Sequence, residues 1–290
     1  MTSCVYSHEY KKRQMRWRFL ILTTSLLYVG VGGSHVPTQQ GEKMTDDFSM
    51  TICDRSWAST DHDAIAVTFR TEKPFHFTPG QYVRVRLLGG QHEDENGDSR
   101  IFNVASPPSV TDRITIITRL RGSAYKKNLL DLPIGSPVFV SQPFGDFALV
   151  DDPSAKHVFL IGGTGIAPIL SMLQHLKETD SKLDVSLFYS NKTIGRIVGE
   201  EVITTGTRDI LQTYVHTLTQ TNRQDDVYEF GRIDENMITG VMTHEELCNA
   251  IFYVSGPWGM GDTMREVLHN IGVPDERIHV KEYDLDLLSK

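Results

Sequence analysis

Residues 159–173 read Phe-Leu-Ile-Gly162-Gly163-Thr164-Gly165-Ile-Ala-Pro168-Ile-Leu-Ser-Met-Leu, and they determine the architecture expected of the whole chain. Residues 157–161 are short, apolar and followed by glycines, as in a buried strand, and from residue 166 the apolar residues follow helical spacing. Pro168 falls in the first helical turn, where its missing N–H costs no hydrogen bond. The pattern predicts a strand, a glycine turn and a helix. Such a turn brings bare backbone and the positive end of a helix to an anion, commonly a dinucleotide pyrophosphate, and a plain tight connection is the structural alternative.

Composition and charge limit the class of protein. The chain has 290 residues, enough for two ordinary domains, and its 39% hydrophobic and 23% charged content is that of a folded chain. Residues 151–290 hold 12 basic and 22 acidic side chains, a net charge of −10, whereas the whole chain carries −8. An acidic C-terminal half argues against general nucleic-acid binding, so no nucleic-acid partner is expected.

The three cysteines, Cys4, Cys53 and Cys248, are scattered along the chain. Their spacing contains no CxxC pair and suits neither zinc nor an iron–sulfur cluster, so we predict no metal site. Isolated thiols are typical of a reducing compartment. We therefore predict a cytoplasmic location, with an organelle matrix or a membrane-tethered form as alternatives.

Residues 1–43 form a basic and apolar segment that we expect to lie outside the fold. Basic side chains precede an apolar run at residues 19–33, which at 15 residues is shorter than a membrane span of roughly 18. The layout is that of a signal peptide or a short anchor. A targeting segment and an over-long start, with synthesis from Met15 or Met44, are further interpretations. Membrane contact is predicted only through residues 19–33.

Residues 44–150 carry the pattern of short strands. Apolar and polar residues alternate in four runs, at residues 65–69, 82–87, 113–118 and 138–140. Turns rich in glycine and proline separate these runs. Strands of this length and spacing predict a small antiparallel barrel. One short helix is expected at residues 123–130, with Ser123 as its N-cap.

Two stretches of this part have the residue types of an anion site. Arg100 and Phe102 are two apart on a strand and face the same side, where a guanidinium can clamp phosphate and a ring can stack on a flat ligand. Gly122 and Ser123 lead into a helix N-terminus, which is a second place for an anion. In a small barrel this combination suits a flavin dinucleotide. The structural alternative is an exposed arginine beside a core phenylalanine.

Residues 151–290 alternate strands with helices. After the glycine turn, strand patterns lie at residues 185–189, 211–218, 251–254 and 278–282. Helical patterns lie at residues 195–203, 243–248 and 259–270. The last helix is expected to bury a stripe formed by Met260, Met264, Val267, Leu268 and Ile271. This alternation predicts a parallel sheet covered by helices on both faces.

Ligands of open parallel sheets bind beyond the carboxyl ends of the strands, where three loops converge in this half. The candidate nucleotide-binding residues of these loops are Gly162, Gly163, Thr164, Gly165, Ser190, Asn191, Lys192, Gly256, Pro257 and Met260. The second loop has no carboxylate to bind the ribose hydroxyls of NAD or to repel a 2′-phosphate. Lys192 and the nearby Arg196 can pair with that phosphate, which favours NADPH over NADH. Solvent-facing charge is the alternative interpretation of these two side chains.

Four motifs occur in sequence, Phe77-Thr-Pro-Gly80-Gln-Tyr-Val83, Arg100-Ile-Phe102-Asn103-Val104-Ala-Ser106, Gly122-Ser123 and Pro143-Phe-Gly-Asp-Phe147. Together with the glycine turn they resemble the successive motifs of the ferredoxin–NADP reductase superfamily, and the resemblance runs from about residue 50 to about residue 283. It implies an FAD-binding β-barrel at residues 44–150 and an NAD(P)-binding α/β domain at residues 151–290.

The resemblance also implies roles for single residues. Arg100 would hold the FAD pyrophosphate from the strand, and Gly122 with Ser123 would bind it from the helix end. Phe102 would lie against the isoalloxazine. Asn103, followed in the same cofactor-binding motif by Val104, would lie near N5. The family usually has tyrosine and then serine or threonine at the positions of Phe102 and Asn103. This difference puts the reaction rate and the redox potential of the flavin in question.

Two further catalytic assignments come from the same resemblance. Ser255 occupies the place of a cysteine near the nicotinamide, where a serine can still form a hydrogen bond. Tyr283 resembles the terminal aromatic residue that shields the flavin in related reductases. Because residues 284–290 follow it, packing in the domain interface is the alternative for Tyr283.

The sequence therefore predicts a two-domain, FAD-dependent NAD(P)H oxidoreductase. A hydride would pass from NAD(P)H to N5 of FAD, and electrons would then pass to an acceptor such as ferredoxin, flavodoxin or a small molecule. A non-catalytic or regulatory electron-transfer subunit that keeps the reductase fold is the alternative. The pattern selects neither the acceptor nor an oligomeric state.

Overall fold

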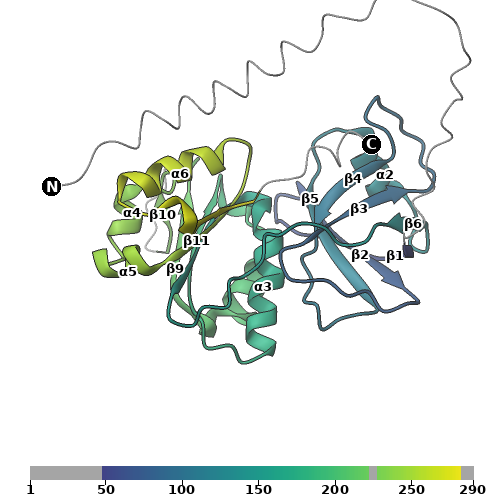
Figure 1. The fold of residues 1–290 in the computed structure, drawn as a ribbon. Helices are drawn as coiled ribbons and strands as arrows, with labels where there is room; N and C mark the ends of the chain where they lie inside the picture. The colour runs from purple at the N-terminus through teal and green to yellow at the C-terminus, as the bar shows by residue number, and fades with distance from the viewer. Residues whose placement is uncertain (1–47, 222–226, 282–290) are drawn as a thin grey trace, which may run out of the picture. The chain divides into compact units, whose positions relative to one another are not determined.

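The computed structural model of the chain describes residues 48–221 and 227–281 (Figure 1). The chain divides into two units, residues 1–44 and 45–290, and the predictions for residues 1–43 lie outside the described residues. Tyr283 lies outside them as well. In the described ranges, no helix is both long enough and apolar enough to cross a membrane.

The first sheet is antiparallel, and its six strands lie in the order β4-β3-β6-β1-β2-β5. These strands are β1 (Phe48–Trp57), β2 (Ala64–Thr71), β3 (Tyr82–Leu87), β4 (Ser99–Asn103), β5 (Arg113–Arg119) and β6 (Pro137–Val140). A bridge between Val104 and Ile116 joins the chain just after β4 to β5, so the two edge strands meet and the sheet curls towards closure. The expected antiparallel β-structure is confirmed.

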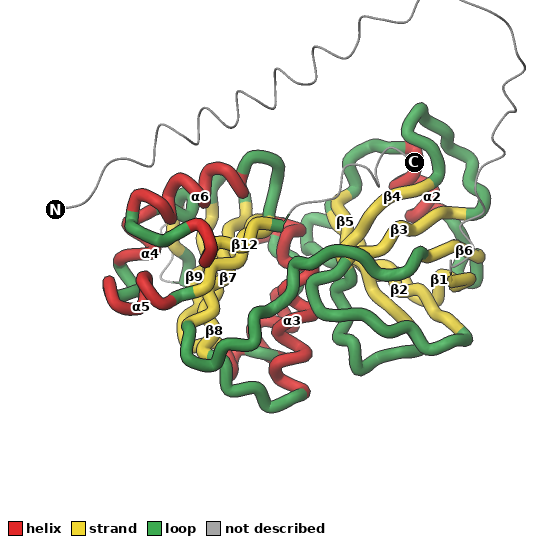
Figure 2. The backbone as a smooth tube through the Cα atoms, in the orientation of Figure 1, coloured by secondary structure: helices red, strands yellow, loops and turns green. Residues whose placement is uncertain are grey.

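Period-2 alternation explains the core of this sheet. In β2, Val67 and Phe69 are buried while the intervening Thr68 is half-buried, and β3 shows the same alternation. The single helix α2 (Ala124–Asp131) begins after Ser123, whose hydroxyl accepts a hydrogen bond from the Lys126 amide as an N-cap should. Figure 2 shows this helix against the strands of the first sheet.

The second sheet is parallel throughout, with the strand order β10-β9-β8-β7-β11-β12. Its strands are β7 (Lys156–Gly162), β8 (Asp184–Asn191), β9 (Leu211–Leu218), β10 (Glu229–Phe230), β11 (Ile251–Ser255) and β12 (Ile278–Val280). Its α-helices are α3 (Ala167–Glu178), α4 (Glu235–Thr239), α5 (His244–Asn249) and α6 (Met260–Asn270).

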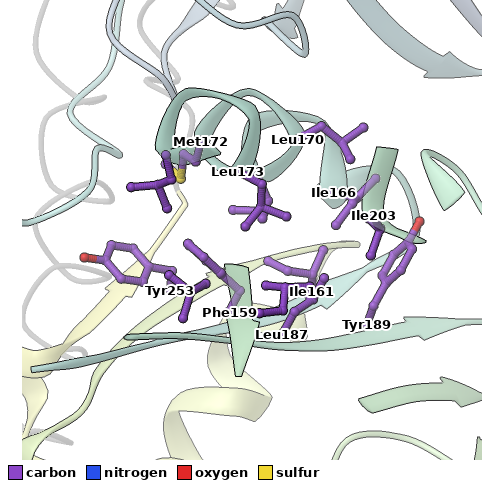
Figure 3. Close-up of a cluster of buried hydrophobic side chains, with 14 of the residues drawn as sticks. Phe159, Ile161, Ile166, Leu170, Met172, Leu173, Leu187, Tyr189, Ile203 and Tyr253 are labelled. Atoms are coloured by element: carbon purple, nitrogen blue, oxygen red, sulfur yellow. The ribbon is translucent and has the colours of Figure 1, made fainter. Parts of the chain in front are cut away.

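Alternate residues of β7 serve two cores on opposite faces of this sheet. Phe159 and Ile161 pack with the apolar residues of α3, as Figure 3 shows. Val158 and Leu160 pack with Met264 and other residues on the face of α6. A strand that is apolar on both faces needs such a double cover, so the predicted arrangement is confirmed.

The stripe predicted on α6 is also present. Met264 and Leu268 are buried, and the partly buried Met260, Val267 and Ile271 pack against the same core. The predicted boundary between the two parts, at residues 150 and 151, falls between the end of β6 and the start of β7. It remains a prediction, because residues 45–290 form one compact unit.

The helix predicted at residues 195–203 is wrong. This segment contains a short 3₁₀ helix, Ile194–Arg196, and the π-helix Val202–Gly206 begins only at its end. Gly199 has a φ of +72°, a left-handed conformation that interrupts a right-handed helix. The hydroxyls of Thr204 and Thr205 donate to carbonyls four residues earlier, a competition typical of threonine in a helix.

Two glycines hold the nucleotide loops together by allowing their backbones to approach. A Cβ at Gly165 would overlap the carbonyl oxygen of Ser255 and lie 2.7 Å from the amide of Gly256. A Cβ at Gly162 would lie 2.8 Å from Pro257. The loop after β7 and the loop after β11 are therefore packed backbone to backbone.

We predict that Gly165→Ala lowers the free energy of unfolding by at least about 2 kcal/mol, because the new methyl meets backbone atoms that cannot turn aside. For a chain of this size the melting temperature should fall by about 4–8 °C. Gly206→Ala is the matched control, since the nearest atom to its added Cβ is 4.0 Å away. Thermal unfolding measures both variants, and equal melting temperatures would contradict the close packing.

Candidate active site

Residues of the β4 motif and of α2 line one cavity of about 460 Å³. Its lining includes Arg100, Phe102 and Asn103 from the strand, Ser123 from the helix cap, and Thr164 from the glycine turn. The predicted strand and helix features thus face one space, which also reaches the turn after β7. Phe102 is only 7% exposed, and its ring lies 5.8 Å from that of Tyr125, so it belongs to the barrel core and to the cavity wall at once.

The Arg100 side chain is held in place by many partners. Its Nη1 donates to the carbonyls of Asn96, Gly97 and Ser99, at 2.7, 3.1 and 2.6 Å. Its Nη2 lies 3.4 Å from Asp94, and its guanidinium lies over the ring of Tyr125 at 5.1 Å. Because these contacts already fix the Arg100 side chain, it would lose little conformational entropy when its remaining N–H groups bind a ligand in the cavity.

Asp94 ties the loop before β4 to α2. Its Oδ2 accepts a hydrogen bond of 2.8 Å from the Ala124 amide in the first turn of that helix, where negative charge is favoured. Sequence reasoning missed this residue, because nothing in the local pattern shows that a loop carboxylate reaches a helix thirty residues later.

A second cavity, of about 620 Å³, lies at the carboxyl ends of the parallel strands. All three predicted loops contribute to its lining, through Gly162, Gly163, Thr164, Ser190, Asn191, Lys192, Gly256, Pro257 and Met260. Four residues line both cavities, namely Thr118, Arg121, Lys126 and Thr164. The space beside Phe102 therefore adjoins the space beside the glycine turn.

Positive charge dominates both linings. The cavities are lined by Arg100, Arg119, Arg121, Lys126, Lys192, Arg196 and Arg232, and none of the described lining residues is Asp or Glu. Burial lowers the pKa of Lys126, and the charges of Arg121 and Arg100 lower it further. A bound anion would relieve this repulsion, as phosphate groups would do.

Four predicted site residues have supporting positions instead of facing a cavity. Val104 is fully buried in the bridge to Ile116, and Gly165 is packed against the backbone of Ser255. Ser255 is 4% exposed and is not part of either lining. Gly122, with a φ of +67°, shapes the turn ahead of Ser123 without lining the cavity.

Arg232 and Asp63 are functional candidates that sequence reasoning missed. Arg232 lines the second cavity, at the carboxyl ends of the parallel strands, which we call the nucleotide cavity. It follows β10, a strand of only two residues, so the sequence has almost no strand pattern there. Asp63 lies in the turn between β1 and β2 and accepts two hydrogen bonds, of 2.5 and 2.7 Å, from Arg119. Its Oδ2 also lies 2.6 Å from Nη2 of Arg196, in the other sheet's loops.

The family model described as the oxidoreductase NAD-binding domain matches residues 159–266. That segment includes the glycine turn, the loop after β8 and the loop after β11, which are the three walls of the larger cavity.

Curated relatives are reductase components of monooxygenases. The reductase component of propane 2-monooxygenase from Mycolicibacterium goodii is 25% identical over 223 residues, covering 74% of this chain and 62% of the relative. The glycine betaine monooxygenase reductase subunit from Chromohalobacter salexigens is 28% identical over 166 residues, covering 52% of this chain and 44% of the relative. The chain thus spans about three fifths or less of the length of these relatives.

Solved structures share the fold. The cytochrome P450 reductase GcoB of Amycolatopsis matches with a TM-score of 0.68 at 21% identity, over 81% of this chain and 69% of that one. Phthalate dioxygenase reductase, a modular structure for electron transfer from pyridine nucleotides to a 2Fe–2S centre, matches with a TM-score of 0.62 at 17% identity, over 81% and 67%.

The match assigns an oxidoreductase NAD-binding domain to residues 159–266, and the fold is shared with solved proteins that bind FAD and pyridine nucleotides. The likeness of its motifs to the ferredoxin–NADP reductase superfamily agrees with this match and with this fold. The residues present fit both cofactors, because guanidinium and ammonium groups and the capping hydroxyl of Ser123 surround the cavities without any opposing carboxylate in the described lining.

We predict that Asp63→Asn lowers the free energy of unfolding at pH 7 by about 1–3 kcal/mol, because two charged hydrogen bonds lose their anionic partner. Burial alone would raise the pKa of Asp63, but the Ser59 hydroxyl and the charges of Arg119 and Arg196 outweigh burial and hold this pKa below its ordinary value. Such a carboxyl stabilises the fold above its unfolded-state pKa, about 3.9, and loses that contribution as pH falls through its folded-state pKa.

Thermal unfolding between pH 3 and pH 8 checks the sign. The gap in melting temperature between the wild type and Asp63→Asn should be full above about pH 5 and should shrink below about pH 4. Asp180→Asn is the control. The side chains of Lys182 and Asp180 in this ion pair are 77% and 88% exposed, so the pair should contribute little to the free energy of unfolding. A gap that does not change with pH would rule out the charge of Asp63 as its source.

Proposed function

We propose that this chain is an FAD-dependent NAD(P)H reductase that delivers electrons to an oxygenase-type acceptor system. One observation carries the proposal: two cavities of about 460 and 620 Å³, both lined by cations, share Thr118, Arg121, Lys126 and Thr164. Two ligands bound there would lie side by side, which is what transfer between two rings requires. The proposed domains are residues 44–150 for FAD and residues 151–290 for the nucleotide.

The chain supplies position and electrostatics. When bound, the cofactors supply hydride transfer from the nicotinamide to N5 of the flavin, followed by passage of electrons to an acceptor. Arg100 and Lys126 hold the flavin phosphates, and Phe102 supports the flat ring. Asn103, 6% exposed on the cavity wall, remains the proposed neighbour of N5, and Ser255 and Tyr283 remain predicted catalytic residues.

NADPH is the proposed preferred donor. Lys192 and Arg232 line the nucleotide cavity, and neither side chain forms an ion pair or a hydrogen bond with another described residue. Both are therefore available to a 2′-phosphate. Arg196, in contrast, is already paired with Asp63. We assign the 2′-phosphate to Lys192 and Arg232 and the inter-sheet ion pair to Arg196.

The relatives support an electron acceptor that is another protein. The matched relatives are named as reductase components or subunits of monooxygenases and a dioxygenase, so an oxygenase or its iron–sulfur carrier is the acceptor class that we propose. In the part of the chain that the structure describes, no group of three metal-ligating side chains is present. Ferredoxin, flavodoxin and a small molecule are the alternatives to be compared in an acceptor assay.

Anaerobic reduction tests the function. The FAD-loaded full chain is mixed with NADPH and then, separately, with NADH, and the visible absorbance of the flavin is followed by stopped flow. We expect NADPH to bleach the flavin band at lower concentration than NADH. A purified chain that takes up no FAD would refute the proposal, and a loaded chain that neither nucleotide bleaches would identify the non-catalytic subunit instead.

We predict that Lys126→Gln weakens FAD binding about 10-fold, because a charge facing the phosphates is lost. Lys127→Gln is the matched control: Lys127 is the next residue of the same helix, is exposed and lines neither cavity. Titration of flavin fluorescence with each apoprotein measures the dissociation constants. Equal affinities of the two variants for FAD would show that the flavin phosphates do not bind beside Lys126.

A further inference from the structure

We propose that His216 is a positioning residue for the pyridine nucleotide: it holds the side-chain amide of Asn191 so that the amide oxygen receives a hydroxyl of the nucleotide ribose. This inference rests on the proposed function, since it concerns the same nucleotide cavity. It assigns a role to a buried residue of β9 that is in the lining of neither cavity described above.

His216 is enclosed by three tyrosines. It is 5% exposed, and its ring stacks on Tyr189 with centroids 5.0 Å apart and an interplanar angle of 17°. The ring of Tyr228 meets it edge to face at 5.0 Å. The hydroxyl of Tyr214 lies 2.9 Å from its Nδ1. The imidazole therefore has one orientation, which packing on two sides and a hydrogen bond maintain.

Asn191 connects this cluster to the cavity. It is the last residue of β8, is 4% exposed and lines the nucleotide cavity. Its Nδ2 lies 3.2 Å from Nε2 of His216. Its Oδ1 is buried and has no hydrogen-bond partner among the described residues. A buried acceptor left unpaired is costly, and a donor on the ligand would satisfy it.

The direction of these hydrogen bonds follows from the groups themselves. An amide nitrogen only donates, so Nε2 of His216 must accept, and the ring proton must be on Nδ1, where it donates to the Tyr214 oxygen. Burial lowers the pKa of His216 to about 4, so the ring stays neutral and Nε2 stays an acceptor near neutral pH. With the ring proton on Nδ1, Nε2 accepts from Nδ2 of Asn191, and Oδ1 is left for the ligand.

The position of Asn191 identifies the ligand group. β8 lies beside β7, whose glycine turn faces the same cavity and suits a pyrophosphate. The group next to the pyrophosphate in a dinucleotide is a ribose, whose hydroxyls can donate to Oδ1. The stacked Tyr189 reinforces this geometry, because its hydroxyl lies 3.1 Å from the carbonyl oxygen of Gly163 in the turn itself.

Three variants of the FAD-loaded full chain test the proposal by calorimetric titration with NADP⁺. His216→Phe keeps a stacking ring and loses the acceptor, so we expect binding at least 10-fold weaker. Asn191→Ala should be weakened to a similar extent. The double variant should bind no more weakly than Asn191→Ala alone, because His216 acts only through Asn191. Binding within 2-fold of wild type for His216→Phe, or additive effects in the double variant, would overturn the proposal.

Two amide substitutions separate positioning from general loss of structure. His216→Gln places an oxygen near the site of Nε2 and should restore binding to within about 3-fold of wild type. In His216→Asn the side chain is one carbon shorter, and this variant should not restore binding. This comparison stands even if His216→Phe fails to fold, and equal binding by the two amide variants would contradict the role of Nε2.

A buried histidine elsewhere in the same sheet is the matched control. His157 on β7 is fully buried, contacts the Tyr253 hydroxyl and the Asp152 carbonyl, and lines neither cavity. We expect His157→Phe to leave the affinity for NADP⁺ unchanged, and flavin content measured by absorbance should be unchanged in all variants. If the wild type binds neither NADP⁺ nor NAD⁺, the proposed function fails together with this inference. If the wild type binds and His216→Phe binds equally well, only this inference fails.

Discussion

The carboxylate of Asp63 links the two sheets at the edge of the nucleotide cavity. It accepts two hydrogen bonds from Nη1 of Arg119, at the end of β5, and faces Arg196, from the loop after β8. Arg119 in turn donates to the Arg196 carbonyl at 2.7 Å. The guanidinium groups of Arg119 and Arg196 line a cavity whose described lining contains no acidic residue. Their mutual repulsion is offset by Asp63, which lies outside that lining. The junction between the two sheets depends on that balance, because it fixes the β1–β2 turn against the loop after β8.

The general architecture was predictable because its signals are local. The switch from a strand pattern to helical spacing around the glycine turn identified β7 and α3, and alternation identified β2, β3 and β5. The strand β1 was missed, since a bulge between Ile52 and Asp54 interrupts its alternation. α4 has only five residues, too few for a periodic pattern. The helix predicted at residues 195–203 is absent because the backbone of Gly199 is left-handed, a conformation that the spacing of apolar residues cannot reveal.

The candidate site was predictable where its residues form contiguous motifs, as in the loops around Gly163 and Gly256. It was not predictable where function depends on contacts between distant residues. Asp63 meets Arg119 across 56 positions, and Asn191 meets His216 across 25. Arg196 matched the expected charge and location, yet its charge is engaged by a barrel residue that sequence distance conceals. A sequence motif shows which side chains are present. Which of these side chains can still bind a ligand depends on the residues that contact them in the folded chain.

The contact of the β1–β2 turn with Gly195 has a consequence for how reductases of this kind can be recombined. The amide of Asp61 donates to the Gly195 carbonyl at 2.8 Å, and a Cβ at Gly195 would lie 1.9 Å from an oxygen of the exposed Asp61 carboxylate, so that carboxylate would have to move. A chimera that exchanges the loop at residues 193–196 therefore keeps this contact only if the β1–β2 turn comes with it or if the new loop retains the glycine.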